Sequence, residues 1–266
     1  MLNTALYKRE MKGSLKMLVI FAVILSMYIS IIIGMYDPKM MKTLDSFYEI
    51  MPELMASVGM TAGATSLIGF MISYLYGFIL LIFPMVFCIL RGNGLIARYA
   101  ESGALVALLA APVKRRTIAA TQAFVLISGI LLLDLYTTGL EIAVAEACFP
   151  NELAIWDLLK LNGALFCLHL LIGSICFLAS CIFSDTKYSL AFGGGVPVFM
   201  YVLQMLANAG KKAEAAKYFT FFTLFDAKGI IANESSAIIS ALLLGVGAIV
   251  LFITGIVIFC KKDLHL

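Results

Sequence analysis

The 266-residue chain is 62% hydrophobic and only 13% charged, with a net charge of +3. Soluble domains are roughly 45 to 50% apolar and about 25% charged, so this composition excludes an ordinary soluble protein. Together with a mean hydropathy of +1.03, it predicts an integral membrane protein. The segments between the apolar runs are too short for a separate catalytic domain. We therefore expect residues 1–266 to form a single membrane domain.

An α-helix needs about 20 predominantly apolar residues to cross a hydrocarbon core of roughly 30 Å. Six runs meet this requirement, or nearly so. The predicted fold is therefore all-α, a polytopic membrane protein with six transmembrane helices. The expected spans are about 17–36, 67–90, 117–140, 161–184, 188–210 and 236–260.

The first span follows a basic segment that contains Lys8, Arg9, Lys12 and Lys16. A basic segment before an apolar run is also typical of a secretory signal peptide. This run is too long for such a signal, and residues 34–38 offer no cleavage site with small residues. We expect a retained helix.

Lys and Arg are enriched in the cytoplasmic loops of membrane proteins. With six spans and both termini inside, the inner segments hold most of the 19 basic residues and few of the 16 acidic ones. This asymmetry predicts cytoplasmic N and C termini, and we expect a multi-pass protein of the cell (cytoplasmic) membrane.

The loop after the first span carries an amphipathic helical pattern, with Asp45, Glu49 and Glu53 opposite an apolar face. We expect a helix there, bent at Pro52. Two interpretations remain open. The helix lies on the outer leaflet or caps the spans, or it forms an outer gate. Its apolar face consists of Leu44, Phe47, Tyr48, Met51, Leu54, Met55 and Val58.

The segment between the second and third spans is too long and too patterned to be a simple turn. Leucines at offsets of 0, 3 and 4, followed by a proline at 7, predict a short helix with one apolar face. Glu101 is expected in its first turn, and basic residues follow its end, as a helix dipole favours. The helix either rests on the inner leaflet or docks a cytoplasmic partner. The residues concerned are Leu105, Leu108, Leu109, Pro112, Lys114, Arg115 and Arg116.

Polar residues inside apolar runs mark possible transport pathways, because a charge at mid-membrane costs at least about 2.5 to 3.5 kcal/mol. Asp134 and Glu141 are seven residues apart and share a helical face, while His169 and Gln204 belong to the fourth and fifth spans. Two interpretations remain open for Asp134. It lines a pathway, or it is a structural residue that bonds to neighbours of Tyr136 or to His169.

The chain has no pattern typical of a catalytic or metal site. Its six cysteines form no C-x-x-C pair, and its two histidines form no H-E-x-x-H motif. The run Gly92-Asn93-Gly94 begins a G-x-G-x-x-A match, but it follows an apolar helix rather than a strand. No G-x-x-x-x-G-K-[ST] sequence occurs, so the chain itself has no P-loop for nucleotide phosphates. We expect no catalytic residues, no metal and no directly bound cofactor.

One sequence order in the inner segment points to a family. It reads Ile96-Ala97, Glu101-Ser102-Gly103, Leu105, Leu108-Leu109, Ala111-Pro112-Val113 and Arg115-Arg116. This order resembles the intracellular signature of ABC-2 type permeases, in which a Glu and a Gly precede a Leu-rich turn and a Pro-Val-x-Arg stop. The basic N-terminal segment resembles the amphipathic elbow helix of that family, and residues 259–264 resemble its C-terminal ending.

The resemblance implies the membrane half of an exporter that moves a drug, peptide, lipid or similar amphipathic substrate outward. Two copies of a separate ATP-binding cassette ATPase would use ATP and Mg, and a second copy of the chain or a related permease would complete the complex. Residues Glu101 to Arg116 would form the coupling helix. The alternative is a membrane protein without transport function, either an intramembrane enzyme or a sensor or scaffold. Membrane lipids are expected partners, and nucleic acids are not.

Overall fold

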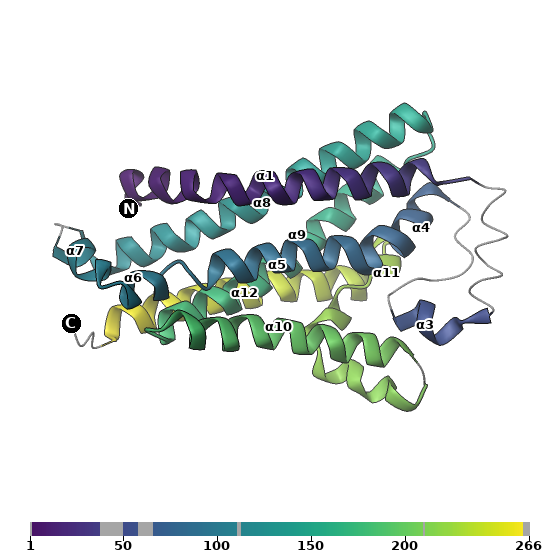
Figure 1. Ribbon diagram of the computed structural model, residues 1–266. Helices are drawn as coiled ribbons and strands as arrows, with labels where there is room; N and C mark the ends of the chain where they lie inside the picture. The colour runs from purple at the N-terminus through teal and green to yellow at the C-terminus, as the bar shows by residue number, and fades with distance from the viewer. Residues whose placement is uncertain (1, 38–49, 58–65, 111–112, 210, 263–266) are drawn as a thin grey trace.

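A computed structural model describes residues 2–37, 50–57, 66–110, 113–209 and 211–262 (Figure 1). All regular secondary structure in these ranges is helical. The elements are α1 (Thr4–Gly34), α3 (Pro52–Ser57), α4 (Leu67–Met71), η1 (Ile72–Ile79), α5 (Leu80–Gly92), α6 (Ala97–Glu101), α7 (Ala104–Ala110), α8 (Arg115–Cys148), α9 (Ile155–Ile182), α10 (Thr186–Ala209), η2 (Lys211–Phe219), η3 (Phe221–Leu224), α11 (Ala227–Ile231) and α12 (Ser235–Lys261).

Six helical segments in the described ranges are long and apolar enough to cross a membrane, which confirms the predicted number of spans. The second is composite and joins α4, η1, α5 and α6 into one segment, Leu67–Glu101. The first and third are longer than the apolar runs predict, because α1 and α8 extend into flanking polar sequence. The class of protein that this fold defines is a multi-pass α-helical membrane protein.

The beginning of α1 and the end of α12 lie at the same end of the bundle (Figure 1). We call this the terminal end, and α6 and α7 lie there too. The opposite end, where α3 and α11 lie, is called the far end. An even number of spans requires this arrangement of the two chain ends.

Helix α9 lies at the centre of the bundle and packs against α12, α10, α5 and α8. In its most apolar stretch 67% of the residues are buried, against 22% in α10. Long apolar side chains on α1, α10 and α12 face outward. Such faces suit the lipid tails around a membrane protein, which are as apolar as leucine.

The predicted N-terminal elbow is not a separate helix. The basic segment is the first part of α1, which runs without a break from Thr4 to Gly34. The side chain of Asn3 accepts a hydrogen bond from the backbone N–H of Leu6 and caps the helix start. No proline follows to interrupt the backbone ladder, and the glycine at position 13 is accommodated within it.

The predicted outer-loop helix is described only in part. Ile50 is helical, Met51 forms a bend and helix α3 begins at Pro52, so the described residues change direction directly before this proline, as the expected bend requires. Proline suits the first helical position because its missing N–H would have no partner there. Leu44, Phe47, Tyr48 and Val58, four residues of the predicted apolar face, lie outside the described residues.

The second span contains an element that the apolar pattern does not predict. Residues Ile72–Ile79 form a π-helix between α4 and α5. π-Helices are rare in proteins, and those that occur are frequently located at functional sites. Tyr76 belongs to this element and is almost fully buried.

Candidate functional site

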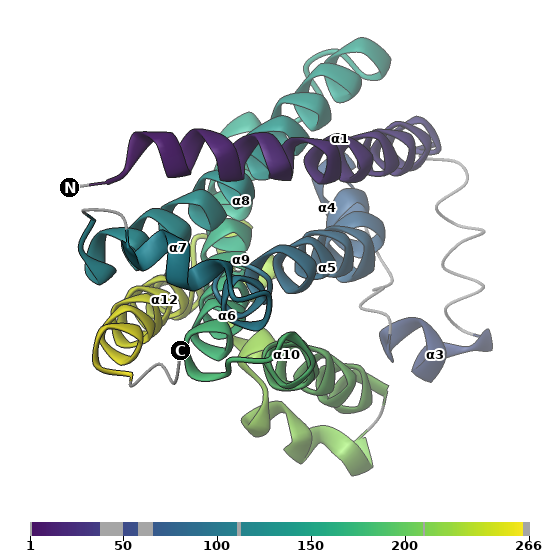
Figure 2. The ribbon, with the colours of Figure 1, turned by 60° about the vertical axis from the view of Figure 1, so that its left-hand side comes forward.

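Two regions bring polar side chains together. The first is the junction at the terminal end, where α6 and α7 connect the second span to the third. Figure 2, turned to bring this end forward, shows α6 near α10, against which it packs, and near α9, to which it is hydrogen-bonded. The second region lies nearer the far end and consists of the buried polar group around Glu141 and the cavity that Gln204 lines.

The inner segment is two helices rather than one. Helix α6 ends at Glu101, and α7 begins at Ala104 after Gly103, whose φ is 71°. Glycine adopts this left-handed conformation without the steric cost that a side chain brings. The prediction that Glu101 lies in the first turn of the loop helix is therefore wrong, because the chain turns at Gly103 and leaves Glu101 in α6.

Helix α6 is attached to α9 at its start. The hydroxyl of Ser180 accepts hydrogen bonds of 2.9 Å from the backbone N–H groups of both Ile96 and Ala97. The first N–H groups of a helix have no partner within it. Here the hydroxyl of Ser180, on the neighbouring spanning helix α9, is the hydrogen-bond acceptor for these N–H groups, so α6 is held to α9.

Two further contacts connect this segment to α10. The carboxylate of Glu101 accepts a 3.3 Å hydrogen bond from the backbone N–H of Thr186. The hydroxyl of Ser189 donates to the side-chain oxygen of Asn93 over 3.1 Å. Asn93 also lies against Gly193, where a Cβ atom would come within 2.2 Å of its oxygen. The close approach of α10 therefore depends on this glycine.

A buried charged cluster connects α6 to α1. Arg91 donates a 2.6 Å hydrogen bond to the Glu10 carboxylate and another of 2.9 Å to the Glu10 carbonyl. The hydroxyl of Tyr99 in α6 donates to the second carboxylate oxygen of Glu10. The guanidinium of Arg98 lies 3.9 Å from the same carboxylate but is 59% exposed. Sequence reasoning did not identify this cluster, because its members are far apart in the chain.

The leucine face of α7 is turned toward the protein. Leu105 is 1% exposed and belongs to the hydrophobic core, and Leu108 is partly buried against that core. The predicted docking face requires Leu105 to be accessible to a partner. In this conformation it is not accessible. The apolar stripe is satisfied by the chain's own core. The side chain of Leu109 and the whole of Pro112 lie outside the described part of the chain.

The basic residues after α7 begin the third span. Arg115 donates a 3.0 Å hydrogen bond to the carbonyl of Lys262, whose ammonium group donates to the carbonyl of Ile182 over 2.7 Å. Partial burial lowers the pKa of Lys262. Arg115 therefore joins α8 to the end of α12, whereas Lys114 and Arg116 are exposed.

The four predicted pathway residues do not form one site. His169 is 2% exposed, and its Nε2 donates to the carbonyl of Leu81 over 3.4 Å. Asp134 is half-buried, and its backbone carbonyl accepts hydrogen bonds from the hydroxyls of Thr137 at 3.0 Å and Thr138 at 2.8 Å. The expected bond to His169 is not present among the described contacts. The hydroxyl of Tyr136 instead pairs with Ser26 at 2.7 Å.

Glu141 has partners that sequence reasoning missed. Its carboxyl group is fully buried and contacts Tyr76 at 3.0 Å and Asn162 at 2.8 Å. A tyrosine and an asparagine within apolar runs are the only signals for these partners in the sequence. The three residues come from η1, α8 and α9, and no helical periodicity reveals that they meet.

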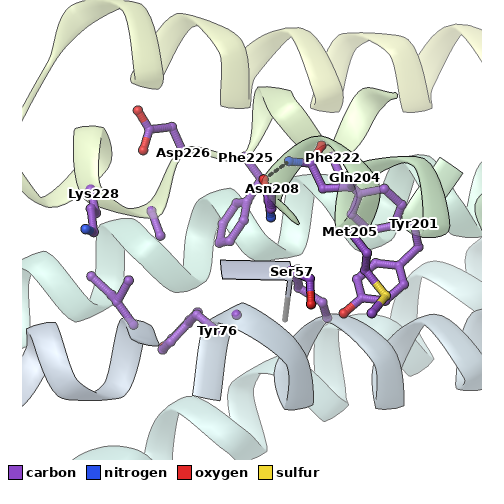
Figure 3. A pocket seen from close by; sticks show the side chains of 14 residues that line it. Ser57, Tyr76, Tyr201, Gln204, Met205, Asn208, Phe222, Phe225, Asp226 and Lys228 are labelled. Carbon is purple, nitrogen blue, oxygen red and sulfur yellow. Dashed lines mark hydrogen bonds between the residues drawn. The ribbon is translucent and has the colours of Figure 1, made fainter. Parts of the chain in front are cut away.

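A cavity of about 180 Å³ lies between η1, α10 and the segment after η2 (Figure 3). Its apolar wall includes Leu81, Met205 and Phe222, and its polar residues include Gln204 and Asn208. These two are joined by a 3.1 Å hydrogen bond, drawn in Figure 3. Of the predicted pathway residues, Gln204 is the one that lines this cavity. Sequence reasoning missed the others, among them Tyr76, Tyr201, Asp226 and Lys228.

The hydroxyl of Tyr201 stands out among the lining residues. The residue is 6% exposed, and its oxygen has no hydrogen-bond partner in the described structure. Leaving a buried hydroxyl unpaired costs about 1 to 3 kcal/mol. The cavity is therefore mostly apolar and contains one hydroxyl that a bound molecule could pair.

The described residues contain no group of three or more metal-ligating side chains. All six cysteines are free thiols. Comparisons with protein-family models, with curated proteins and with solved structures found no match. The functional argument therefore depends on the geometry of the chain itself.

Proposed function

We propose that this chain is the membrane-spanning permease subunit of an ATP-driven exporter. A separate ATP-binding cassette subunit, in two copies with its ATP and Mg, would drive a pair of permease chains. The cargo is an amphipathic molecule such as a drug, a peptide or a lipid. The terminal end then faces the cytoplasm, and the membrane is the cell membrane.

One observation carries this proposal: the α6 region is bonded to three spanning helices at once. It contacts α1 through Glu10, α9 through Ser180 and α10 through Thr186. A partner that pushes on α6 would displace these three helices together. Mechanical transmission of this kind requires a rigid element with a few anchoring side chains.

The burial of Leu105 changes which residues can contact the ATPase. The exposed charged side chains of this region include Arg98, Glu101 and Arg116, and its exposed apolar residues are small, such as Ala104 and Ala110. We therefore assign the docking contact to these side chains rather than to the leucine face. Charged groups at the rim of an interface mainly affect association rate and specificity.

The cavity supports the choice of cargo. It is bordered by aromatic and aliphatic side chains, with Asp226 and Lys228 at exposed positions near its edge. Binding sites for small molecules are typically apolar with a few placed polar groups. The volume of about 180 Å³ is enough for part of an amphipathic molecule, not for a large cargo.

The exporter proposal is tested by isolating the full chain from native membranes in lipid nanodiscs. We expect an ATP-binding cassette subunit to accompany it, with ATPase activity that rises when cargo is added. Arg116→Glu, at an exposed position outside the Glu10 cluster, should reduce the recovered ATPase at least tenfold without lowering the yield of folded permease. Lys160→Glu, which reverses an exposed charge at the far end, is the matched control and should retain the ATPase.

A chain that moves cargo or carries out its activity alone, without nucleotide, would contradict the proposal. The same holds for a native preparation that contains no cassette subunit at all. The second candidate, a membrane enzyme or scaffold, would then be favoured.

A further inference from the structure

The buried contacts of Glu141 form a closed ring of three groups. Its Oε2 lies 3.0 Å from the hydroxyl oxygen of Tyr76 and 2.8 Å from the amide nitrogen of Asn162. The hydroxyl oxygen of Tyr76 in turn lies 2.9 Å from the amide oxygen of Asn162. Each pair of groups is thus within hydrogen-bond distance. The three residues come from α8, η1 and α9, and all are buried.

Three hydrogen bonds need three hydrogens inside the ring, and Tyr76 and Asn162 supply only two there, because the Asn162 amide nitrogen makes one ring contact and uses one of its two hydrogens in it. A tyrosine hydroxyl has one hydrogen, and an ionised carboxylate has none. The amide nitrogen of Asn162 serves its contact with Glu141. The single hydrogen of Tyr76 can serve Glu141 or Asn162, but not both. One contact would then bring two acceptors together without a hydrogen between them.

Exchanging the amide oxygen and nitrogen of Asn162 does not remove this shortage. The nitrogen would then donate to Tyr76, and Tyr76 would donate to Glu141. The amide oxygen of Asn162 would face the carboxylate of Glu141 with no hydrogen between them. Both amide orientations therefore need a third hydrogen, and the carboxyl group of Glu141 is the one group in the ring that can carry it.

The surroundings of Glu141 offer no positive charge to balance a carboxylate. Helix α12 from 235 to 260, the second span from 67 to 90 and α1 from 17 to 34 contain no charged residue. The other acids on the apolar part of α8 and after it are Asp134, about 10 Å from Glu141 along the axis, and Glu146, about 7.5 Å from it in the other direction, at 1.5 Å per residue. The ionisable groups of the facing elements include Tyr28 on α1, Tyr74 and Tyr76 on η1, Cys88 on α5, and Asp157, Lys160, Cys167 and His169 on α9. The remaining ones, among them Cys176, Cys181, Cys260, Arg91 and the charged residues at the start of α1, lie toward the terminal end.

Of these groups, Lys160 is exposed and paired with Asp157 at 3.0 Å, and His169 donates to a backbone carbonyl. The second carboxyl oxygen of Glu141 has no hydrogen-bond partner in the described structure. A buried charge without compensation is far more costly than a buried neutral group. The hydrogen count and the surroundings therefore both favour a neutral carboxyl group.

We propose that Glu141, Tyr76 and Asn162 form an intramembrane proton-binding site that is occupied in this conformation. The ligand is a proton, held on Oε2 of Glu141. On release, the O–H bond breaks and the proton passes to a water molecule, which leaves a carboxylate. Tyr76 and Asn162 then both donate to that carboxylate, and the contact between Tyr76 and Asn162 loses its hydrogen.

Proton release therefore changes the contact between η1 and α9. Tyr76 also lines the cavity between η1 and α10. The residue whose hydrogen bonds change on proton release is therefore part of the cavity wall. This inference does not depend on the exporter function. It holds equally for a membrane protein of another kind.

Infrared difference spectroscopy of the full chain in lipid nanodiscs tests the site. The spectrum of the wild type minus that of Glu141→Gln at neutral pH should contain the C=O stretching band of a protonated carboxylic acid. This band should shift in heavy water. The same band should remain when Glu141→Gln is compared in an Asp134→Asn background, because Asp134 is outside the ring.

Carboxylate bands in place of the carboxylic acid band in that difference spectrum would overturn the proposal. The Tyr76→Phe variant provides a second measurement if Glu141→Gln does not fold. It removes one hydrogen-bonding partner of the carboxyl group, so the carboxylic acid band should shift in frequency. A neutral-pH spectrum of Tyr76→Phe with every carboxylic acid band unchanged from the wild type would also contradict the site.

Discussion

Arg91 donates a 2.6 Å hydrogen bond to the carboxylate of Glu10, 81 residues earlier in the chain. Both side chains are less than a tenth exposed. The pair joins the start of the first span to the end of the second at the terminal end of the bundle. Since Tyr99 of α6 also donates to Glu10, the position of α6 depends on α1.

We expect Glu10→Ala to destabilise the protein by about 3 to 5 kcal/mol, because it leaves the Arg91 charge buried without its partner. Unfolding by a denaturing detergent in mixed micelles measures this free energy. Asp157→Ala, which breaks the exposed pair with Lys160, is the control and should cost at most about 1 kcal/mol. Equal losses of unfolding free energy in the two variants would show that the buried pair contributes no more to stability than the exposed pair.

Two glycines on α10 provide a matched test of close helix packing. A Cβ atom at Gly193 would lie 2.2 Å from the side-chain oxygen of Asn93 and 3.0 Å from Cα of Cys176. We expect Gly193→Ala to cost about 1 to 3 kcal/mol through this overpacking. Gly195→Ala, with nothing within 4 Å, should be neutral or stabilising, because alanine favours a helix more than glycine. A thermal denaturation series compares them, and similar melting temperatures would contradict the packing described.

Removal of the Ser180 hydroxyl should loosen α6 locally. Ser180→Ala leaves the N–H groups of Ile96 and Ala97 without their acceptor, at a cost of about 1 to 3 kcal/mol. Hydrogen exchange at these two amides should accelerate, while the centre of α9 remains protected. Ser174→Ala is the control, because among the described contacts that hydroxyl bonds to a carbonyl of its own helix, at Leu171. Unchanged exchange at residues 96 and 97 would rule out the attachment.

Tyr201→Phe separates stability from binding at the cavity. Without cargo, we expect the variant to be as stable as the wild type or more stable by up to about 1 kcal/mol, because the unpaired hydroxyl is removed. If this hydroxyl pairs with cargo, cargo affinity should fall by roughly fivefold to tenfold, as loss of one hydrogen bond implies. Titration with a fluorescent amphiphile measures the affinity. A variant that is less stable in the absence of cargo would show that the hydroxyl has a partner within the protein.

The number of spans was predictable because each apolar run has the length that a bilayer requires. Helix periodicity also identified the apolar face of Leu105 and Leu108. It could not show what covers that face, because an apolar stripe is satisfied equally by a partner, by lipid or by the chain's own core. The structure places Leu105 in the core.

The polar contacts were less predictable than the spans. Glu141 was selected as an intramembrane acid, but Tyr76 and Asn162 were not identified as its partners. Whether these side chains meet depends on the orientation of η1 and α9 about their own axes. The packing of the neighbouring helices determines that orientation. The break at Gly103 was missed because glycine is compatible with both a helix and a turn.

The π-helix at Ile72–Ile79 has a consequence for any scan of the second span. Its hydrogen bonds reach one residue further along the chain than those of an α-helix, so the helical phase beyond it is displaced by about one residue, or roughly 100°. A cysteine-accessibility pattern that repeats every 3.6 residues in α4 will therefore be out of step in α5. If a labelling map of the second span is fitted with a single uninterrupted period, the lipid-facing side found in α4 will be assigned to interior positions in α5.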